Sequence, residues 1–302
     1  MKILITGGTN GMGKGLAKVL AKDPAQHELI LMCRSQTLGE RTADELQRAT
    51  GNPNITNLLC DLGDLMNVRD GALKIKDLHD SLDGIFFNAG MGYAKQQYVT
   101  PNGLDGHFQI NYLAQSMLVL NLLDLLEKSE AGGRVVLNVS RGGALDWNDI
   151  QQKQKWSYVK GIQQGMVAKR LFLQKMHHFY QNNTHQSISF IGYETPKTVW
   201  TNQINIIPWY MQAPAYLMKG LGQFISIETS GQYIAPLFQE SAESARTHSG
   251  QIITHKKQQL QSLELDPIDH SIADQDRLWS ESLALIKDTQ TQTVASRLEH
   301  SS

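Results

Sequence analysis

Short apolar segments alternate with segments of helical spacing from Lys2 to Gly192. The apolar segments are continuous, which is typical of strands buried on both faces of a sheet. The predicted strands are Lys2–Thr6, Glu28–Cys33, Asn54–Cys60, Gly84–Phe87, Arg134–Ser140 and Ser187–Gly192. The predicted helices are Gly11–Lys22, Thr37–Thr50, Leu65–His79, Leu104–Lys128 and Tyr158–Gln181. This order predicts an α/β fold, with a doubly wound parallel sheet and helices on both of its faces.

A glycine-rich turn joins the first predicted strand to the first predicted helix. It reads Thr-Gly-Gly-Thr-Asn-Gly-Met-Gly over residues 6–13. Gly7 allows the tight turn, Gly11 lets the main chain approach a pyrophosphate, and Gly13 lets the helix pack closely on the strand. The start of the helix adds unpaired N–H groups and a positive dipole end. The turn therefore predicts a dinucleotide site that includes Gly7, Thr9, Asn10, Gly11, Met12 and Gly13.

The pattern loosens after Gly192. Residues 193–224 mix proline, tryptophan, tyrosine and methionine, and helix-like and strand-like segments then return. Gln251–Thr254 is the last predicted strand, and Ser271–Lys287 is the last predicted helix. We therefore expect a single Rossmann-type domain over residues 1–302. It divides into a dinucleotide-binding core (1–192), a small substrate cap (193–250), and the last strand with the C-terminal helix (251–290).

Composition and charge argue against several classes of protein. Lys plus Arg number 28 and Asp plus Glu number 29, so nothing indicates a nucleic-acid-binding surface. No apolar run approaches the roughly 18 residues that a membrane-spanning helix needs. The first apolar run is broken by glycine too early for a signal peptide. Cys33 and Cys60 end predicted buried strands, which is typical of core residues in a reducing compartment. We expect a cytoplasmic protein without a metal site.

Further motifs lie after the later predicted strands. Cys60-Asp61-Leu62 follows the third strand, Asn88-Ala89-Gly90 follows the fourth, and residues 107–111 read His-Phe-Gln-Ile-Asn. Residues 196–201 read Pro-Lys-Thr-Val-Trp-Thr. Together with the glycine turn, these motifs resemble the short-chain dehydrogenase/reductase family. Within that family they resemble the branch of retinol dehydrogenases and protochlorophyllide reductases. The resemblance extends from Lys2 to Lys287, which is nearly the whole chain.

The resemblance implies roles for these residues. The acidic motif after the third strand would contact adenine, and the Asn-Ala-Gly motif would line the cofactor. Thr201 would end the family's PGxVxT motif, in which Lys197 here replaces the glycine. The implied cofactor-binding residues beyond the glycine turn are Asp61, Leu62, Asn88, Ala89, Gly90 and Thr201.

The residue after the second strand indicates which dinucleotide is bound. Folds that bind NAD place a carboxylate there for the ribose hydroxyls, but this chain reads Cys33-Arg34-Ser35. Arg34 can pair with a 2′-phosphate in a planar, bidentate way, and Lys14 in the glycine turn adds a second positive charge. Charge-assisted hydrogen bonds are worth roughly 1.5 to 3 kcal/mol each. We therefore expect NADP(H) as the cofactor.

Catalysis in the family uses a serine, a tyrosine, a lysine four residues after the tyrosine, and an asparagine. Asn111 matches the asparagine, which helps to hold a proton-relaying water. A gap-free alignment of Arg134–Ser140 places Ser140 at the serine that orients the substrate carbonyl. Matching Asn138-Val139-Ser140 to the family's Asn-Val-Ser places Arg141 there instead. We favour Ser140.

No Tyr-x-x-x-Lys occurs in the helix where the family carries it. One alignment places Ile162 at the tyrosine and Met166 at the lysine, and a shift of three residues places Gly165 and Lys169 there. The tyrosine is absent in both alignments. Positioned acid/base groups contribute roughly 100- to 10,000-fold, so ordinary carbonyl reduction needs another proton donor. Tyr158 lies one helical turn before Ile162 on the same face.

Three functions are compatible with this pattern. The first is an NADPH-dependent oxidoreductase with a relocated proton donor, either Tyr158 or one of Tyr193, Tyr210 and Tyr216 from the cap. The second is an NADPH-binding sensor or partner subunit without turnover. The third is a non-redox enzyme, for a cyclisation or dehydration. The intact nucleotide motifs favour the first two.

The cap and two helices indicate partners. Residues 204–224 are rich in large apolar side chains, which favours a bulky lipophilic or aromatic small-molecule substrate. The same residues could instead cover the core. Many members of the family pair through the helices that correspond to Leu104–Lys128 and Tyr158–Gln181, so a homo-oligomer is compatible with the sequence.

Overall fold

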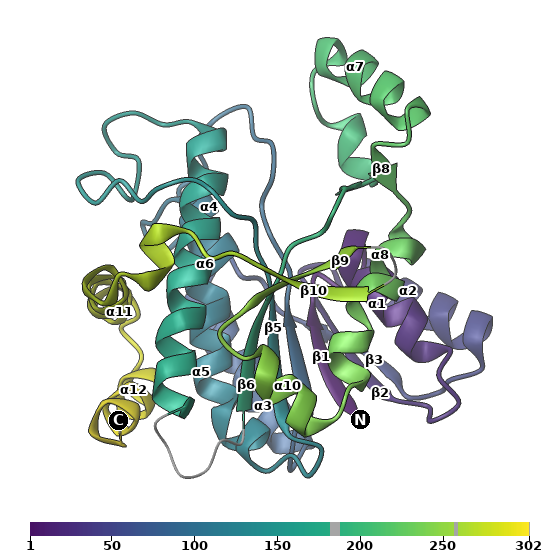
Figure 1. Ribbon diagram of the computed structural model, residues 1–302, viewed down its shortest axis with the longest axis horizontal. Helices are drawn as coiled ribbons and strands as arrows, with labels where there is room; N and C mark the ends of the chain where they lie inside the picture. The colour runs from purple at the N-terminus through teal and green to yellow at the C-terminus, as the bar shows by residue number, and fades with distance from the viewer. Residues whose placement is uncertain (182–187, 257–258, 302) are drawn as a thin grey trace.

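A twisted, mostly parallel sheet forms the centre of the computed structural model, which describes residues 1–181, 188–256 and 259–301 (Figure 1). Its strand order is β10-β9-β6-β5-β4-β1-β2-β3, and only the pairing of β10 with β9 is antiparallel. This order confirms the predicted Rossmann-type α/β fold. The strands are β1 (Lys2–Thr6), β2 (Glu28–Cys33), β3 (Ile55–Leu59), β4 (Gly84–Phe87), β5 (Gly133–Asn138), β6 (Ile188–Tyr193), β9 (Ile252–Lys256) and β10 (Gln259–Leu263). Ser187, which the sequence assigned to the sixth strand, lies outside the described residues.

Alternate residues of each central strand enter two separate hydrophobic clusters. In β1, Ile3 and Ile5 belong to one cluster and Leu4 to the other. In β4, Phe86 faces one side of the sheet, and Ile85 and Phe87 face the other. Since successive side chains of a strand point to opposite faces, the sheet is buried on both sides. The uniformly apolar strand sequences follow from this burial.

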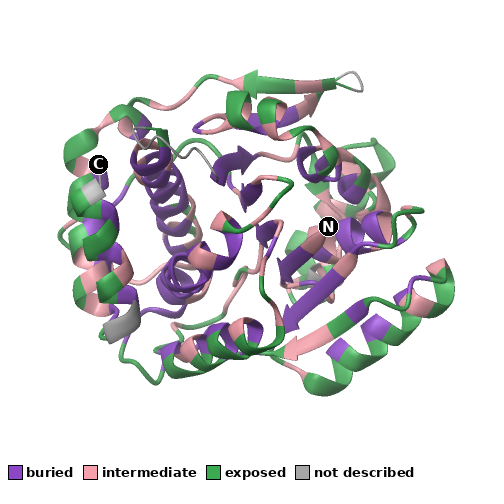
Figure 2. Ribbon diagram, turned by 90° about the horizontal axis from the view of Figure 1, so that it is seen from below, coloured by how far each residue is buried: buried purple, intermediate pink, exposed green. Residues whose placement is uncertain are grey.

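Helices cover both faces of the sheet (Figure 2). One face carries α1 (Gly11–Ala21), α2 (Gln36–Thr50), α8 (Ile227–Ile234), α9 (Pro236–Gln239) and α10 (Ala242–His248). The other carries α3 (Leu65–Leu78), α5 (Ala114–Glu127) and α6 (Tyr158–Gln181). Beyond α5 and α6 lie η3 (Pro267–His270), α11 (Ile272–Leu285) and α12 (Thr289–Ser301).

The predicted helix over Leu104–Lys128 consists of three parts. It begins as α4 (Gly106–Phe108), continues as a π-helical turn labelled η1 (Gln109–Leu113), and ends as α5. Asp105 caps its start by accepting hydrogen bonds from the amides of His107 and Phe108. Periodicity alone does not reveal a single wide turn, and such turns occur frequently at functional sites. This one contains Asn111.

Two elements near the C-terminus were not predicted from the sequence. Strand β10 is a largely exposed edge strand in which glutamines replace the apolar pattern, so backbone pairing with β9 forms it rather than side-chain burial. Helix α12 follows α11 after a short turn, and it buries Ala295 and Leu298 in the hydrophobic cluster that contains α5. Neither has the strong periodicity on which sequence reasoning depends.

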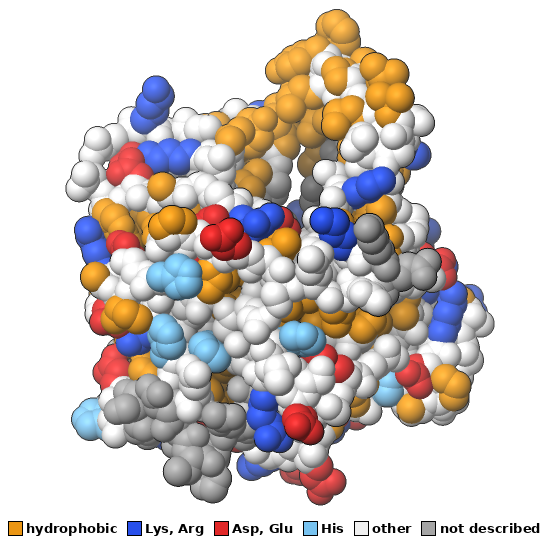
Figure 3. Space-filling model, in the orientation of Figure 1, with side chains coloured by type: hydrophobic (Ala, Val, Ile, Leu, Met, Phe, Trp, Pro, Cys, Tyr) orange, Lys and Arg blue, Asp and Glu red, His pale blue; other side chains and the backbone are white. Residues whose placement is uncertain are grey.

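An arm projects from the carboxyl side of the sheet (Figures 1 and 3). It contains β7 (Thr198–Val199), η2 (Asn202–Asn205), α7 (Trp209–Gly220) and β8 (Phe224–Ile225), with β7 paired to β8. No residue of α7 is buried among those that the structure describes. In contrast, the following helices α8 to α10 bury Ile234, Leu237 and Phe238 against the sheet. Tyr193 is the last residue of β6 rather than part of the arm.

Candidate active site

The glycine turn follows β1 and leaves no space for side chains at two of its glycines. Gly7 has a φ of +68°, and a Cβ added there would lie 3.1 Å from the Ala89 Cα. A Cβ on Gly13 would lie 2.5 Å from the Gly7 carbonyl oxygen and 2.9 Å from the Asn88 Nδ2. These close approaches bring the start of α1 against the end of β1, as the dinucleotide motif requires.

Gly11 faces open space instead. A Cβ added there would have one neighbour within 4 Å, the Thr201 methyl group at 3.5 Å. The amides of the first helical turn have no acceptors within the helix, and Asn10 caps the turn through Gly11 N at 2.8 Å. Thr9 and Met12, which complete the predicted cradle, are half-buried. The turn therefore offers hydrogen-bond donors and space to a phosphate. Thr201 lies beside the turn although it is 190 residues away in sequence.

The Asn-Ala-Gly motif after β4 is joined to β1 through a buried hydroxyl. The amides of Asn88 and Ala89 donate to Thr6 Oγ1 at 2.9 and 3.0 Å. Asn88 Nδ2 donates to the Thr6 carbonyl at 3.1 Å, and the buried Gln115 donates to the Ala89 carbonyl at 2.7 Å. The motif is thus held next to the glycine turn. Sequence reasoning missed Gln115, a buried polar residue in a largely apolar helix.

The residues that would recognise the adenosine half lie after β2 and β3. Arg34 is exposed and has no hydrogen bond or ion pair with any described residue. Lys14 pairs with Glu45 of α2 at 2.8 Å. Arg34 is therefore the cation that is available to a 2′-phosphate, whereas Lys14 already has a carboxylate partner. This partner weakens the sequence argument that had counted both charges.

The acidic motif after β3 presents one carboxylate. Asp61 is exposed and accepts a hydrogen bond from the Gly63 amide at 2.8 Å. Leu62 is buried, and its carbonyl accepts a hydrogen bond from Gln109 at 3.2 Å. An apolar side chain with an adjacent carboxylate is a suitable surface for an adenine ring and its amino group.

Asn111 lies in the π-helical turn and binds the loop after β4. Its Oδ1 accepts from the Met91 amide at 2.5 Å, and its Nδ2 donates to the Met91 carbonyl at 3.1 Å. A Cβ on Gly90 would lie 3.3 Å from this Oδ1. Asn111 also lies against α6, where a Cβ on Gly165 would be 2.9 Å from the Asn111 Cβ. The residue therefore links the cofactor loop to α6.

Helix α6 presents Tyr158, Ile162 and Met166 at intervals of four residues, and all three are half-buried. The ring of Tyr158 packs edge-on against Tyr93 with 5.0 Å between centroids. Tyr93 belongs to the loop after β4, so Tyr158 lies at the carboxyl end of the sheet. In this geometry, neither Ile162 nor Met166 can exchange a proton or supply a charge.

Lys169 is buried on α6, one helical turn after Gly165. Its Nζ donates to the Asn138 carbonyl at 3.1 Å and lies 5.2 Å from the centroid of the Phe87 ring. Burial lowers the pKa of Lys169 to about 7. The alignment that places a family lysine at this position therefore puts it in the layer between α6 and the sheet.

Ser140 follows β5 and is exposed. Its hydroxyl has no hydrogen bond to any described residue, whereas its carbonyl accepts one from Arg170 at 2.5 Å. The competing residue, Arg141, pairs with Glu194 at 3.3 Å. The arrangement leaves the Ser140 hydroxyl able to bind a ligand at the carboxyl end of the sheet.

The three alternative tyrosines differ in position. Tyr193 is fully buried in β6, and burial raises its pKa far above the usual value, so it cannot reach a substrate. Tyr210 and Tyr216 are exposed on α7, and the ring of Tyr216 packs against Trp200 at 5.0 Å. Among the alternatives, only the tyrosines of the arm are accessible.

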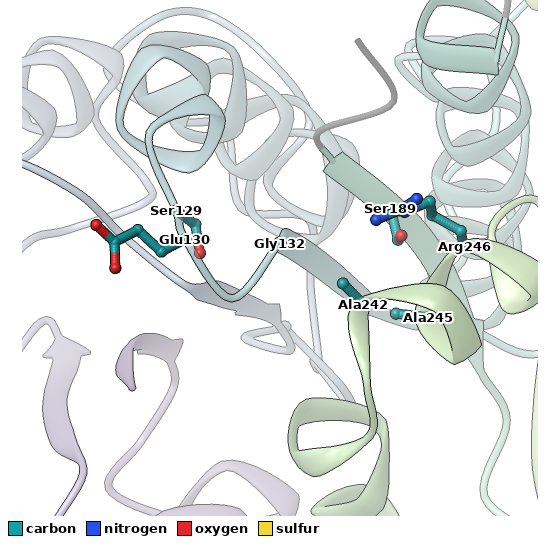
Figure 4. Close-up of a pocket in the computed structure, with 7 residues that line it drawn as sticks. All are labelled: Ser129, Glu130, Gly132, Ser189, Ala242, Ala245 and Arg246. Atoms are coloured by element: carbon teal, nitrogen blue, oxygen red, sulfur yellow. The ribbon is translucent and has the colours of Figure 1, made fainter.

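A pocket lies elsewhere in the fold, beside the first residues of β5 and β6 (Figure 4). Its lining comes from the turn before β5, from Ser189, and from α10. Ligands of open α/β sheets bind outside the carboxyl ends of the strands, and this pocket is at the amino ends. Among the described residues, no three His, Cys, Asp or Glu side chains are grouped to hold a metal ion.

A model of the short chain dehydrogenase family matches residues 1–150. The match ends eight residues before the start of α6. Helix α6 is the helix in which the chain departs from the family's Tyr-x-x-x-Lys. The fold, the glycine turn and the loop after β4 agree with this match. The chain belongs to the short-chain dehydrogenase/reductase family and resembles its retinol-dehydrogenase-like branch.

Three curated relatives illustrate the similarity. Retinol dehydrogenase 13 of Mus musculus is 29% identical over 186 residues, which are 60% of this chain and 54% of the relative. Polyprenol dehydrogenase of Homo sapiens is 28% identical over 175 residues, 56% and 52% of the two chains. Dehydrogenase/reductase SDR family member 12 of Homo sapiens is 34% identical over 155 residues, 50% and 47%. The chain thus spans about half the length of the curated relatives it matches.

Solved structures share the fold over most of the chain. An uncharacterized protein of Mycobacterium paratuberculosis has a TM-score of 0.65 at 19% identity, over 95% of this chain and 93% of that one. L-Sorbose reductase of Gluconobacter frateurii, complexed with NADPH and L-sorbose, has a TM-score of 0.65 at 16% identity, over 84% and 94%. No helix among the described residues is long and apolar enough to cross a membrane.

Proposed function

We propose that this protein is an NADP(H)-dependent oxidoreductase that acts on a bulky lipophilic or aromatic substrate through an atypical active site. The observation that carries this proposal is the dinucleotide cradle. Gly7 has a left-handed backbone with close neighbours, and Gly13 has no room for a Cβ, while Gly11 faces open space. A fold that had lost its nucleotide would have no need of this combination. The single-domain division and the cytoplasmic location remain predictions.

The unpaired Arg34 guanidinium supports NADP(H) over NAD(H). We expect Arg34→Ala to weaken NADPH binding by about 10-fold or more, because one charge-assisted contact to the 2′-phosphate is worth roughly 1.5 to 3 kcal/mol. NADH binding should stay within about twofold, since NADH lacks that phosphate. Titration of each nucleotide by fluorescence measures both constants.

Arg41→Ala is the matched control, because Arg41 is also an exposed arginine but lies in the second turn of α2, after Arg34. Equal losses of NADPH affinity in the two variants would show that the effect of Arg34→Ala comes from general surface charge. Failure of the wild type to bind either nucleotide would contradict the proposed function as a whole.

The positions of three side chains support the catalytic roles that we propose for them. NADPH, when bound, supplies a hydride to the substrate carbon. The Ser140 hydroxyl then binds the substrate oxygen, and the Tyr158 hydroxyl donates the proton that this oxygen takes up. Asn111 positions the loop after β4 and the facing turn of α6. Tyr158 stands at the mouth of this region beside Tyr93.

The apolar arm supports a lipophilic substrate. Its exposed side chains include Trp209, Tyr210, Leu217 and Leu221 (Figure 3). Closure of this arm over the carboxyl end of the sheet would enclose an apolar molecule between the arm and the sheet. The names of two relatives, retinol dehydrogenase 13 and polyprenol dehydrogenase, refer to isoprenoid alcohols of this class.

A turnover assay tests the proton donor. NADPH oxidation is followed with a panel of lipophilic ketones, enals and imines that includes all-trans-retinal. We expect Tyr158→Phe to lower kcat by about 100-fold or more, within the range for a lost acid/base group. Tyr210→Phe is the control on the exposed arm. A larger loss of kcat in Tyr210→Phe would indicate that the proton donor lies on the arm.

The replacement of Tyr-x-x-x-Lys favours a second candidate, an NADPH-binding sensor or partner subunit without turnover. In one of the two alignments, the half-buried Ile162 and Met166 stand where the family carries its tyrosine and lysine, and in both alignments the tyrosine is absent. Tight NADPH binding without oxidation by any substrate of the panel would support this candidate. A non-redox reaction on the same fold would instead show substrate conversion with unchanged NADPH.

A further inference from the structure

The backbone of residues 140–142, just after β5, is held by charged side chains from three other segments. Arg170 of α6 donates through Nη1 to the carbonyls of Ser140 at 2.5 Å and Gly142 at 3.0 Å. The Gly142 amide donates to Asp266 Oδ2 at 2.6 Å. The Arg141 amide donates to Glu194 Oε2, also at 2.6 Å. Four backbone polar groups of this short loop are therefore bonded to side chains from outside it.

Arg170 is the centre of this arrangement. It is fully buried, and its Nε donates to both carboxylate oxygens of Asp269 at 2.9 and 3.1 Å. Its Nη2 forms an ion pair with Asp266 at 2.9 Å. Asp266 and Asp269 also cap the short helix η3, and Asp269 is 1% exposed. The guanidinium thus connects α6, the loop after β5 and the segment before α11.

Such a buried cluster is poorly explained by stability alone. Removing charges from water is costly, and well-packed apolar residues often stabilise a fold equally well. What a buried arginine held by two carboxylates supplies is a fixed geometry. Here that geometry is imposed on the loop that carries Ser140, whose own hydroxyl is exposed and has no described partner.

We propose that Arg170, Asp266 and Asp269 are positioning residues that set the orientation of the Ser140 hydroxyl toward the substrate. The proposal rests on the proposed function, because it assigns these residues to the reaction of that site. Misplacement of a reacting group by about 1 Å can cost about 100-fold in rate. The three residues act on the substrate only through the loop that they hold.

The test uses Asp266, which is partly exposed and can be replaced without leaving a cavity in the core. With NADPH and all-trans-retinal, or the most active substrate of the panel, Asp266→Ala is expected to lower kcat by about 10-fold. The NADPH dissociation constant should be unchanged. Asp266→Asn keeps an acceptor for the Gly142 amide, so it should recover part of the lost kcat. Lys175→Met, which removes an exposed ion pair of α6 with Asp276, is the control.

A cycle with Ser140→Ala separates positioning from general stability. If Asp266 acts through Ser140, then Asp266→Ala should cost no further kcat in the Ser140→Ala background. Losses that multiply across the two sites would overturn the proposal, because the cluster would then act independently of the hydroxyl. Equal kcat in wild type and Asp266→Ala would overturn it too.

Amide exchange distinguishes failure of this proposal from failure of the proposed function. In the full chain, amides 141 and 142 should exchange at least about 10-fold more slowly in the wild type than in Asp266→Ala. If no substrate is turned over but this difference is present, the proposed function fails, and with it the catalytic role of the cluster. If turnover is present and exchange is equal, only the positioning proposal fails.

Discussion

At the scale of single residues, Lys169 is the most consequential side chain outside the candidate site. It lies in the apolar layer between α6 and the sheet, where its Nζ donates to the Asn138 carbonyl and faces the Phe87 ring. Burial lowers its pKa to about 7 from an ordinary 10.5. Folding at neutral pH therefore opposes protonation of this amine, and no carboxylate within the described part of the chain offsets the effect.

This pKa shift predicts how stability depends on pH. Between pH 7 and pH 10.5 the unfolded chain holds the Lys169 proton and the folded chain does not. The free energy of unfolding contributed by Lys169 therefore rises with pH across this window, by on the order of 1 kcal/mol per pH unit. Below pH 7 both states are protonated, and the full penalty remains.

Lys169→Met should remove this dependence and should stabilise the fold most at neutral and lower pH. Urea denaturation of both proteins from about pH 6 to pH 9 measures the difference, which should narrow as the pH rises. Half-buried Lys175, which pairs with Asp276, gives the control, because Lys175→Met should leave the slope unchanged. A constant difference across the window would contradict the assigned pKa.

At the scale of elements, the contact between α1 and α8 is made by glycines. A Cβ on Gly15 would overlap the Ile227 carbonyl oxygen, and a Cβ on Gly231 would overlap that of Gly15. Ion pairs from Lys18 and Lys22 to Glu228 flank this contact at 2.8 and 2.6 Å. Helix α8 therefore supports the helix whose N-terminus forms the dinucleotide cradle.

We expect Gly15→Ala to destabilise the protein by about 1 to 3 kcal/mol, the usual cost of overpacking, and to weaken NADPH binding by displacing α1. Gly220→Ala is the control, because a Cβ there meets nothing within 4 Å and alanine favours a helix. Thermal denaturation and nucleotide titration measure both effects. Unchanged stability in Gly15→Ala would show that α8 can move away freely.

At the scale of the whole molecule, the C-terminal helices cover the two helices through which many family members pair. Helix α11 packs on α6, with Trp279 against Phe179 at 5.2 Å. Helix α12 packs on α5, where Asn121 donates to Thr291 at 2.8 Å and Arg297 pairs with Glu127 at 3.1 Å. The helices α5 and α6, which left a homo-oligomer compatible with the sequence, therefore carry α12 and α11 of the same chain.

Removal of α12 should expose apolar positions of α5 and make the protein associate. Truncation after Lys287 loses the burial of Ala295 and Leu298, and full burial of one leucine is worth about 1.5 to 3 kcal/mol. We expect a lower Tm and a larger mass by light scattering than for the intact chain. Arg297→Ala, which removes the ion pair with Glu127 but none of this apolar burial, should change neither. A truncated chain of unaltered Tm and mass would contradict this role of α12.

The sequence by itself determined the sheet core and the glycine turn after its first strand. Continuous apolar strands, helical spacing and fixed glycine positions are local signals, so β1 to β6 and the glycine turn were predicted within one or two residues of where they lie. The absence of a Tyr-x-x-x-Lys was equally readable, because it concerns residue types within one helix.

Only the tertiary structure decided which polar and charged side chains are accessible to a ligand and which already have partners or are buried. Lys14 pairs with Glu45, Arg170 is buried against Asp269, and Tyr193 is enclosed in β6. The chain also folds α11 and α12 back over α5 and α6, which no local pattern in either pair of helices indicates. These outcomes depend on contacts between segments far apart in the chain. Whether a charge meets a partner, water or a ligand is set by that packing, because burial and distance determine its energy and sequence spacing does not.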